Sequence, residues 1–381
     1  MTLAFLIYSY FPYGGQQRDF LRVAKACAQR GHKVLVFTMK WQGEVPESFE
    51  VIKIAAKAWS RHGLYQDFTA KVKSQLTLRA IDCVVGFNKM PGLDLYFAAD
   101  PCFAERAHTQ RGYYYRFTPR YRHFMAYESA VFGAASHTHT LLLSPLQRQQ
   151  FTKNYPDSVA RLHDIPPGIS RDRLPPNNAE KIRETFRSGF SITPQQLLIV
   201  TIGSGFVVKG IDRAMRAIAA LPDHIRQRVR YFIIGQDKEL RFKRLAEKLK
   251  IAQQCEFLGG RDDVPRFLLG ADLLLHPAYS ESAGYVLLEA TIAGLPVLTT
   301  DTCGYAFHIE KADVGLVCPS PFSQQTLNRN LEIMLCSDKR AQWRANGIAY
   351  GQTEDLYSMP ETVATMIEQL AEQQQREGAV A

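Results

Sequence analysis

Short runs of apolar residues alternate with longer stretches of helical spacing along most of this chain. The apolar runs cover residues 3–8, 33–38, 83–87, 140–144, 197–203, 230–235 and 272–278. Buried strands of a parallel sheet are nearly continuous in apolar residues, and the connections between such strands are helices that cross over the sheet. The pattern therefore predicts an α/β protein with parallel sheets and crossover helices.

A proline-rich stretch divides this series in two. Residues 165–178, IPPGISRDRLPPNN, hold four prolines and a glycine, as is typical of a domain boundary. A chain of 381 residues is also long enough for two domains. Ligands of such sheets bind beyond the carboxyl ends of the strands, so we expect two Rossmann-like lobes with the chemistry in a cleft between them. The expected parts are a first domain over 1–168, a second over 169–355, a helix over 356–372 that returns to the first domain, and a polar tail over 373–381.

Charge and cysteine content narrow the class of protein. The chain has 46 Lys and Arg against 37 Asp and Glu, and the whole excess lies in residues 1–172, which hold 22 basic and 13 acidic residues. A basic half favours an anionic partner, which could be nucleic acid, a phospholipid surface or a phosphorylated substrate. The seven cysteines contain no C-x-x-C pair, which indicates a reduced protein without a zinc site. No segment looks like a secretion signal or a membrane span, so we expect neither.

A Gly-Gly turn follows the first predicted strand and opens a helix predicted over 16–30. The missing Cβ of Gly15 lets a ligand approach the backbone, and a helix N-terminus suits a phosphate or a sugar oxygen. The G-x-G-x-x-G pattern is absent, which argues against NAD. Asp19 is expected in the first turn of this helix, where it either interacts with the helix dipole alone or also faces the ligand.

The second half carries the sharper pattern, because residues 272–300 read as strand, loop, helix, Gly-Leu-Pro turn and strand. Glu281 in the loop is either a solvated residue or an acceptor for sugar hydroxyls, since a phosphate would repel it. Glu289 in the helix is either exposed or, because its neighbours are apolar, a carboxylate with a dedicated partner such as a ribose. The N–H groups expected to bind a diphosphate are those of Ala283, Gly284, Tyr285 and Val286.

Three basic residues, Arg173, Lys209 and Arg261, either belong to the ordinary surface or enter the same site. A leaving nucleoside diphosphate gains negative charge, and side-chain cations can neutralise that charge without a metal. The sequence has no D-x-D and no H-E-x-x-H motif, and the nearby histidines 137 and 139 fit alternation beside a strand. We therefore expect no metal and no cofactor.

Residues 103–132 combine five arginines with five tyrosines and four phenylalanines, against two glutamates. Beyond Pro119 the apolar residues follow helical spacing. Interleaved arginines and aromatic residues suit an anionic membrane interface, with reversible adhesion at about 1 kcal/mol per basic residue. The alternatives are an ordinary domain helix with solvated arginines, or contact with RNA. No other segment of the chain resembles an RNA-binding motif. The expected membrane contacts are Arg111, Tyr113, Tyr114, Arg116, Arg120, Tyr121 and Arg122.

Several segments resemble the lipopolysaccharide core glucosyltransferase I family, which are retaining family 4 glycosyltransferases with the GT-B fold. The resemblance runs from about residue 3 to residue 370. The two glutamates with seven residues between them mark the broader group, and GFNKMPGLD and FAAD are narrower. Val208 departs from the pattern, because some relatives carry a basic residue just before the lysine at 209. The resembling segments include GGQQRDF, GFNKMPGLDLYFAADPCF, RYRHF, PPGI, KGIDR, GQDK, GADLLLHPAYSESAGYVLLEA, GLPVLTT, CGYA and PFSQQTLN.

The resemblance implies transfer of glucose from UDP-glucose to heptose II of the lipopolysaccharide inner core, with an α-1,3 linkage and retention of configuration. Retention leaves two routes open, namely a front-face substitution assisted by the departing phosphate and a covalent intermediate on Asp19 or Glu281. Asp100, in FAAD, is a further candidate catalytic carboxylate. The implied donor contacts are Gly15 and Asp19 with phosphate and glucose, Arg173, Lys209 and Arg261 with the diphosphate, Glu281 with the glucose and Glu289 with the ribose.

The expected partners are UDP-glucose, the lipopolysaccharide inner-core acceptor and an anionic membrane surface, without nucleic acid. The domain over 1–168 is expected to bind the acceptor and face the membrane, and the domain over 169–355 to bind the nucleotide sugar. The expected location is the cytoplasmic face of the bacterial inner membrane, as a peripheral protein. Two other classes of function stay open at this point. One is a non-catalytic nucleotide-sugar-binding protein of the membrane surface, and the other is a sugar-nucleotide epimerase on the same architecture. Release of UDP with and without an acceptor distinguishes the three.

Overall fold

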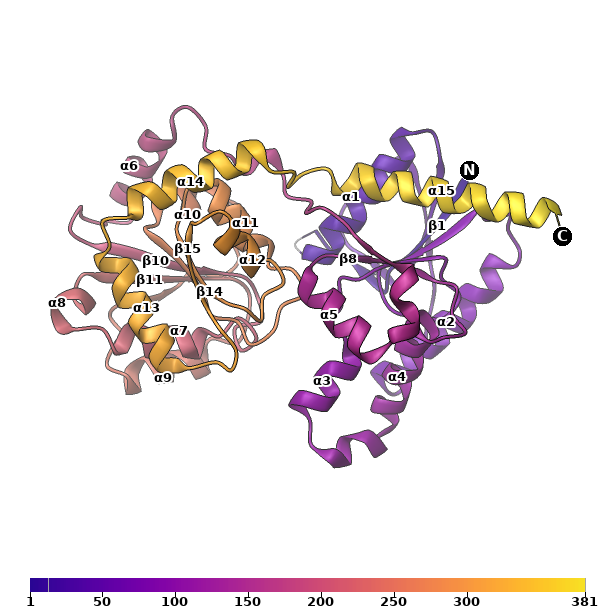
Figure 1. The fold of residues 1–381 in the computed structure, drawn as a ribbon, viewed down its shortest axis with the longest axis horizontal. Coiled ribbons are helices and arrows are strands. Elements are labelled where there is room, and N and C mark those ends of the chain that lie inside the picture. The colour runs from indigo at the N-terminus through magenta and orange to yellow at the C-terminus, as the bar shows by residue number, and fades with distance from the viewer. Residues whose placement is uncertain (13, 381) are drawn as a thin grey trace. The chain divides into compact units, whose positions relative to one another are not determined.

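The structure is a computed structural model that describes residues 1–12 and 14–380. It divides the chain into two compact units, each with a parallel sheet and helices packed against it (Figure 1). Unit 1 comprises residues 1–168 together with 357–381, and unit 2 comprises residues 169–356. The α/β class with two Rossmann-like domains is thereby confirmed.

Unit 1 contains a seven-stranded sheet in which every strand pair is parallel, in the order β5-β3-β1-β6-β7-β8-β9. The central strands are almost entirely apolar because helices cover both of their faces. A short second sheet pairs β2 (Ser9–Tyr10) with β4 (Lys40–Trp41). The main strands are β1 (Thr2–Leu6), β3 (Lys33–Thr38), β5 (Phe49–Lys53), β6 (Cys83–Gly86), β7 (Leu95–Phe97), β8 (His139–Leu142) and β9 (Leu162–Asp164).

Helices α3 and α4, joined by the short 3-10 helix η1, project from the sheet of unit 1 (Figure 1). Thr118 caps α4 by accepting a hydrogen bond from the N–H of Tyr121, and Pro119 occupies the first helical position. Val131 and Phe132 are fully buried, so the apolar face of α4 packs into the unit, as the domain-helix alternative requires. The helices of unit 1 are α1 (Gly15–Gln29), α2 (Arg61–Leu76), α3 (Phe103–Gln110), η1 (Tyr113–Phe117), α4 (Pro119–Phe132), α5 (Pro145–Asn154), η2 (Pro156–Arg161) and α15 (Met359–Val380).

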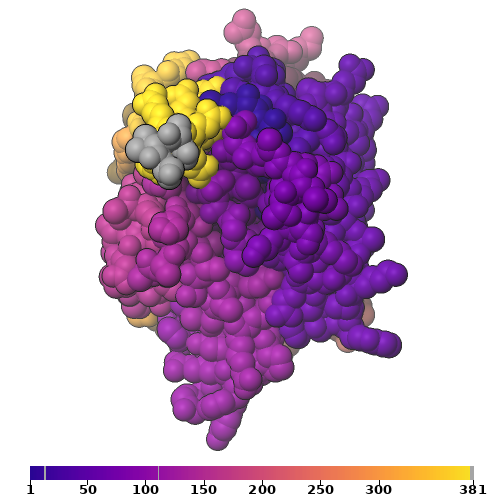
Figure 2. Space-filling view, turned by 90° about the vertical axis from the view of Figure 1, so that its right-hand side faces the viewer, coloured from indigo at the N-terminus to yellow at the C-terminus, as the bar shows by residue number. Residues whose placement is uncertain are grey.

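The last helix, α15, packs on α1 within unit 1 (Figure 1). Figure 2 shows the yellow C-terminal part of the chain beside the indigo N-terminal part. The guanidinium of Arg30 lies 2.6 Å from a carboxylate oxygen of Glu361 and 2.8 Å from one of Glu368. His32 lies 2.6 Å from the other oxygen of Glu368. The expected helix over 356–372 was too short, because α15 runs from Met359 to Val380 and includes most of the segment that we expected to be a polar tail. Glutamine and glutamate are good helix formers, so a polar composition alone does not end a helix.

Unit 2 contains a six-stranded parallel sheet in the order β12-β11-β10-β13-β14-β15. Its strands are β10 (Leu197–Ile202), β11 (Val229–Ile234), β12 (Cys255–Phe257), β13 (Leu273–His276), β14 (Val297–Thr300) and β15 (Gly315–Cys318). Its helices are η3 (Arg171–Arg173), α6 (Ala179–Gly189), α7 (Ile211–Ala219), α8 (Asp223–Arg226), α9 (Leu240–Lys248), α10 (Val264–Gly270), α11 (Tyr285–Ile292), α12 (Ala306–Lys311), α13 (Gln324–Cys336) and α14 (Arg340–Thr353).

Helix α11 lies in the interior of unit 2, where every residue from Val286 to Ile292 is buried. A helix that is covered on all sides needs no polar face, which explains the unbroken apolar run on either side of Glu289. Among the described residues, no helix combines the length and the apolar character that crossing a bilayer requires.

Candidate active site

The centre of the candidate site in unit 2 is a cluster of Lys209, His276 and Glu281. Lys209 lies in the loop after β10, and His276 ends the neighbouring strand β13. The carboxyl ends of parallel strands meet at one edge of a sheet, which is where the two loops converge. The Lys209 ammonium pairs with Oε1 of Glu281, and Nε2 of His276 lies 2.7 Å from Oε2 of the same carboxylate.

The cluster carries two cations for one carboxylate. Burial alone would raise the pKa of Glu281, but the charges of Lys209 and His276 outweigh it and lower that pKa to about 2. Burial alone would lower the pKa of His276, but the Glu281 carboxylate, together with the neighbouring Cys303, reverses this and raises that pKa to about 9. Near neutral pH the carboxyl is therefore ionised, the imidazole is protonated, and the cluster as a whole is positive. Such a cluster favours an anionic ligand.

The backbone around Glu281 is fixed on both sides. Its N–H donates to the carbonyl oxygen of Thr302 over 3.0 Å, and its own carbonyl accepts from Gly304 N–H over 3.0 Å. These bonds form an isolated parallel bridge with Cys303. The Glu281 side chain is 19% exposed and paired at both oxygens, so the interpretation as a solvated loop residue is wrong.

The turn before α11 places the first amides of that helix beside this loop. Gly284 is the N-cap with φ +98°, a backbone conformation that strongly favours glycine. The first turn is closed by Leu287 N–H donating to the Gly284 carbonyl over 2.9 Å. Of the four expected diphosphate donors, Tyr285 and Val286 lie in the first turn of α11, whereas Ala283 and Gly284 precede the helix.

Glu289 is buried in α11, with 8% of its surface exposed, so the alternative of an exposed helix residue is wrong. Nε of Arg173, in η3, lies 3.8 Å from Oε1 of Glu289. The structure thus brings Arg173 to the carboxylate expected to bind a ribose. Its predicted contact with the diphosphate stays a prediction.

The third expected cation, Arg261, is held by an acidic neighbour. Its Nε and one terminal nitrogen lie 2.8 and 2.9 Å from the two carboxylate oxygens of Asp263. Arg261 is therefore charged but already paired, and its role in diphosphate binding also stays a prediction. Val208 is exposed, and its carbonyl accepts a hydrogen bond from Tyr279 N–H over 2.8 Å, which ties the Lys209 loop to the loop after β13.

In unit 1, α1 begins at Gly15, as the Gly-Gly turn predicts. Asp19 lies in the second turn and is buried, with 2% of its surface exposed. The first turn of α1 as described contains no acidic residue, so our placement of Asp19 there was wrong, and with it the interpretation as a simple interaction with the helix dipole. The side chains of Gln16 and Gln17 donate to the carbonyls of Phe87 and Ser9 and fix the start of the helix.

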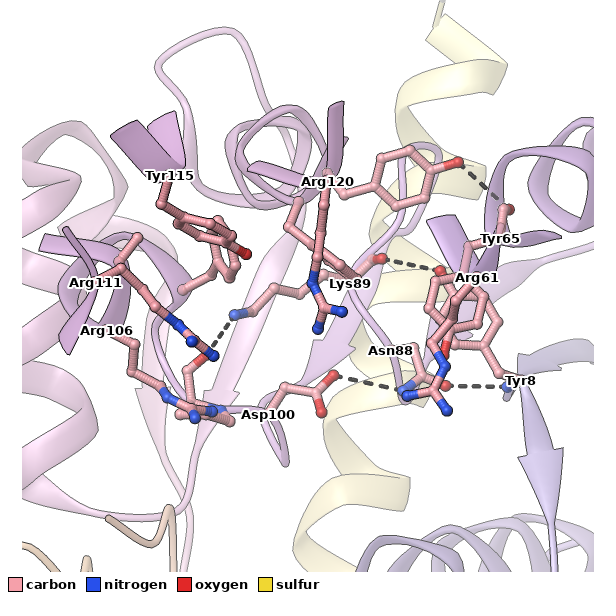
Figure 3. Close-up of a pocket in the computed structure, with 15 residues that line it drawn as sticks. Tyr8, Arg61, Tyr65, Asn88, Lys89, Asp100, Arg106, Arg111, Tyr115 and Arg120 are labelled. Carbon is pink, nitrogen blue, oxygen red and sulfur yellow. Dashed lines mark hydrogen bonds between the residues drawn. The ribbon is translucent and has the colours of Figure 1, made fainter. Parts of the chain in front are cut away.

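Asp100 faces a separate cavity of about 420 Å³ that lies wholly in unit 1 (Figure 3). Burial raises the pKa of its carboxyl, and Asn88 Nδ2 lies 3.4 Å from its Oδ2. Two of the expected membrane contacts, Arg111 and Arg120, line this cavity. The others lie elsewhere on the projection. Tyr113, Tyr114 and Arg116 are exposed on η1, Arg122 is exposed on α4, and Tyr121 is half-buried against Phe103 and Tyr115.

Sequence reasoning missed His276 and Cys303. Together with Glu281 they offer three potential metal ligands, whose atoms lie within 4.8 Å of one another. Lys209 and His276 already occupy the two Glu281 oxygens, and the raised pKa of His276 means that a proton competes with any metal for the imidazole. The sequence offered one indication of His276, namely a single histidine at the end of an otherwise apolar strand.

Comparison with known proteins gives matches over both halves. The family model "Glycosyltransferase Family 4" matches residues 13–173, and "Glycosyl transferases group 1" matches residues 182–350. The lipopolysaccharide glucosyltransferase WaaG of Escherichia coli (strain K12) is 46% identical over 368 residues, which cover 96% of this chain and 98% of WaaG.

Solved structures agree with these matches. The crystal structure of WaaG, a glycosyltransferase involved in lipopolysaccharide biosynthesis, is similar with a TM-score of 0.91 over 96% of this chain and 99% of that one. Anabaena Alr3699/HepE in complex with UDP-glucose has a TM-score of 0.74 at 17% identity, over 97% of this chain and 100% of that one, which bears on the fold alone. The chain therefore belongs to the WaaG-type lipopolysaccharide glucosyltransferases, a family of glycosyltransferases with the GT-B fold.

Proposed function

We propose that this enzyme transfers glucose from UDP-glucose to heptose II of the lipopolysaccharide inner core, forming an α-1,3 linkage with retention. The observation that carries the donor half of the proposal is the positive cluster of Lys209, His276 and Glu281 beside the start of α11. The sugar, the acceptor and the linkage rest on the resemblance described above.

The donor diphosphate binds at the Lys209 ammonium and the first amides of α11. A helix N-terminus and a cationic side chain both stabilise phosphate, and both gain strength as UDP leaves and its charge grows. Because this charge comes from fixed groups of the protein, the proposed reaction needs no divalent ion. Transfer that persists in EDTA is the expected result.

The two glutamates position the sugars of the donor. Glu281 accepts hydrogen bonds from glucose hydroxyls through the lone pairs that Lys209 and His276 leave available. Glu289 accepts from the ribose hydroxyls, and Arg173, whose Nε lies 3.8 Å from its Oε1, orients that buried carboxylate.

For retention, the pairing of Glu281 supports a front-face route. A carboxylate with a pKa of about 2 and a cation on each oxygen is a weak nucleophile. In the front-face route the departing phosphate accepts the proton of the acceptor hydroxyl as the new bond forms. Asp19 is the remaining candidate for a covalent intermediate. If that route operates, mass spectrometry of the enzyme from a quenched reaction with UDP-glucose would show a glucosyl adduct on Asp19.

We further propose that the enzyme adheres reversibly to the cytoplasmic face of the inner membrane through η1. Tyr113, Tyr114 and Phe117 are 65%, 84% and 58% exposed on the projecting segment, with Arg116 among them. Exposed aromatic rings beside arginines suit the headgroup region of an anionic bilayer. Replacing both Tyr113 and Tyr114 by serine should lower sedimentation with phosphatidylglycerol vesicles and leave binding of UDP unchanged.

The deciding assay incubates the enzyme with UDP-glucose, with and without heptose-terminated lipopolysaccharide core, and measures released UDP and the linkage of the product. Transfer predicts UDP release that depends on the acceptor. UDP binding without consumption of UDP-glucose would favour the non-catalytic alternative. A new sugar nucleotide formed without acceptor would favour the epimerase.

A further inference from the structure

The cavity that contains Asp100 has an unusual charge balance. Its lining holds five cationic side chains against one carboxylate (Figure 3). Its volume of about 420 Å³ is in the range of small-molecule sites, roughly 300–1,000 Å³. The cations are Arg61, Lys89, Arg106, Arg111 and Arg120.

In the part of the chain that the structure describes, four of these cations form no ion pair with a carboxylate, and Arg106 interacts with Asp100 only through its charge at longer range. The four are the arginines, which come from α2, from α3 and its C-cap, and from α4. The guanidinium groups of Arg111 and Arg120 lie 5.5 Å from the ring centres of Tyr115 and Phe124, which orients them without using their hydrogen-bond donors. Like charges gathered around one cavity repel each other, so the arrangement favours a bound anion.

Lys89 differs from the arginines because its charge is neutralised inside the unit. Its ammonium pairs with Glu128, which is fully buried. The Glu128 carboxylate also accepts from the N–H groups of Phe103 and Ala104 over 2.7 and 2.8 Å and thereby fixes the start of α3. Glu128 is a positioning residue for the cavity wall, and the unpaired positive charge of the cavity belongs to the arginines.

Asp100 and Asn88 make the cavity unsuited to an anion alone. In Figure 3 the carboxylate of Asp100 lies between the guanidinium of Arg106 and the side chain of Asn88. A carboxylate repels phosphate but accepts hydrogen bonds from hydroxyl groups. The amide of Asn88 can both donate and accept hydrogen bonds. Phenol groups of Tyr8 and Tyr65 lie on the Asn88 side of the cavity and add surface suited to a sugar ring. The ligand that satisfies both parts is an anion attached to a polyol.

We propose that this cavity binds a phosphorylated sugar of the acceptor, with the arginines binding the phosphoryl group and Asp100 and Asn88 binding its hydroxyls. Planar guanidinium groups match the oxygens of a phosphoryl group in a two-pronged geometry, which a lysine cannot reproduce. The assignment of the occupant to the acceptor rests on the proposed function, whereas the chemistry of the cavity does not.

The test is titration calorimetry on the full chain with mannose 6-phosphate, mannose and inorganic phosphate. Mannose 6-phosphate should bind at least about tenfold more tightly than either of the other two, because only it engages both parts of the cavity. Changing both Arg106→Gln and Arg120→Gln should weaken its binding at least about tenfold. These arginines are exposed, so the variants should fold, and an unchanged circular dichroism spectrum and thermal unfolding midpoint check this.

Arg122→Gln is the matched control, because Arg122 lies on the same helix as Arg120 and outside the lining. It should bind mannose 6-phosphate like the unchanged protein. Equal effects of Arg122→Gln and Arg120→Gln, together with displacement of mannose 6-phosphate by phosphatidylglycerol vesicles, would mean that the arginines serve a phospholipid surface and would overturn the proposal. Inorganic phosphate binding as tightly as mannose 6-phosphate would overturn it as well.

A second arm separates this proposal from the proposed function. With lipopolysaccharide core as acceptor, the KM for the acceptor should be at least about tenfold higher in the double arginine variant than in the unchanged enzyme, while the KM for UDP-glucose stays the same. After phosphatase treatment of the acceptor, the two enzymes should have the same KM for it. Absence of UDP release by the unchanged enzyme would refute the proposed function, and arginine-dependent binding of mannose 6-phosphate would still support the cavity assignment. Binding that ignores the arginine changes would refute the cavity assignment alone.

Discussion

Replacing Lys209 by methionine should disable the donor site while leaving the fold of unit 2 intact. Methionine keeps the length of the side chain and removes its charge. Glu281 then retains only His276 as a charged partner, and the cluster changes from positive to neutral. The site loses the cation that we expect to stabilise the leaving diphosphate.

The size of the effect follows from the burial of the pair. Removing one preorganised donor to a developing charge lowers the rate roughly 100- to 1,000-fold, so kcat/KM for UDP-glucose should fall by about that factor. Removing one partner of a fully buried ion pair costs about 3–5 kcal/mol. The side chains here are 16% and 19% exposed and His276 stays, so the loss of unfolding free energy should lie at about 3 kcal/mol or below.

The assay measures UDP release against donor concentration, with urea unfolding as the measure of stability. Lys243→Met is the matched control, because Lys243 is an exposed lysine of the same unit whose ammonium forms an ion pair with Glu239, the N-cap of α9, and lies 5.5 Å from the ring centre of Phe257. That variant should keep both activity and stability. A Lys209→Met enzyme with the kinetics of the unchanged protein would refute the assignment of the diphosphate to this cluster.

Four further changes test separate parts of the site. Glu281 raises the pKa of His276 from 6.5 to about 9 against the effect of burial, so their ion pair stabilises the fold fully below pH 6.5 and loses this contribution as the pH rises through 9. The unfolding free energy measured with urea should therefore be higher below pH 6.5 than above pH 9, and His276→Gln should make this difference smaller. Glu289→Ala should raise the KM for UDP-glucose or abolish turnover, and unchanged kinetics would contradict its role at the ribose. Asp19→Ala should lower kcat while circular dichroism and UDP binding stay unchanged, and loss of the fold would mean that its role is structural. Gly284→Ala should cost about 1–2 kcal/mol in thermal unfolding and weaken UDP binding, because φ at this position is +98° and the added Cβ would lie 3.2 Å from Leu287.

The fold could be predicted where apolar runs are long. The runs at 197–203 and 230–235 became β10 and β11, whose residues are almost all buried. Strands such as β7 and β12 have only three residues each, and β12 is half-exposed, so no run of letters distinguished them from loops. Their existence depends on the neighbouring strands with which they pair, and that information lies far away in the sequence.

The candidate site shows the same division. Spacing found Glu281 and Glu289 because both stand out against apolar neighbours. It could not find that His276 pairs with Glu281, since this contact depends on how the loop after β13 turns back. It also predicted membrane contacts for Arg111 and Arg120, which stay predictions, and it could not show that the fold of α3 and α4 places both along the cavity of unit 1. The sequence shows that a residue is charged but not which way its side chain points. The packing of its helix determines that direction.

The position of α15 bears on how the protein is made. The helix belongs to unit 1 but is synthesised after all of unit 2, so the surface of α1 around Arg30 stays uncovered while residues 169–356 emerge from the ribosome. Unit 2 is continuous in sequence and can complete its sheet during that interval. The unit that begins first therefore finishes last, and a nascent chain interrupted anywhere before residue 357 leaves uncovered the part of α1 that α15 contacts.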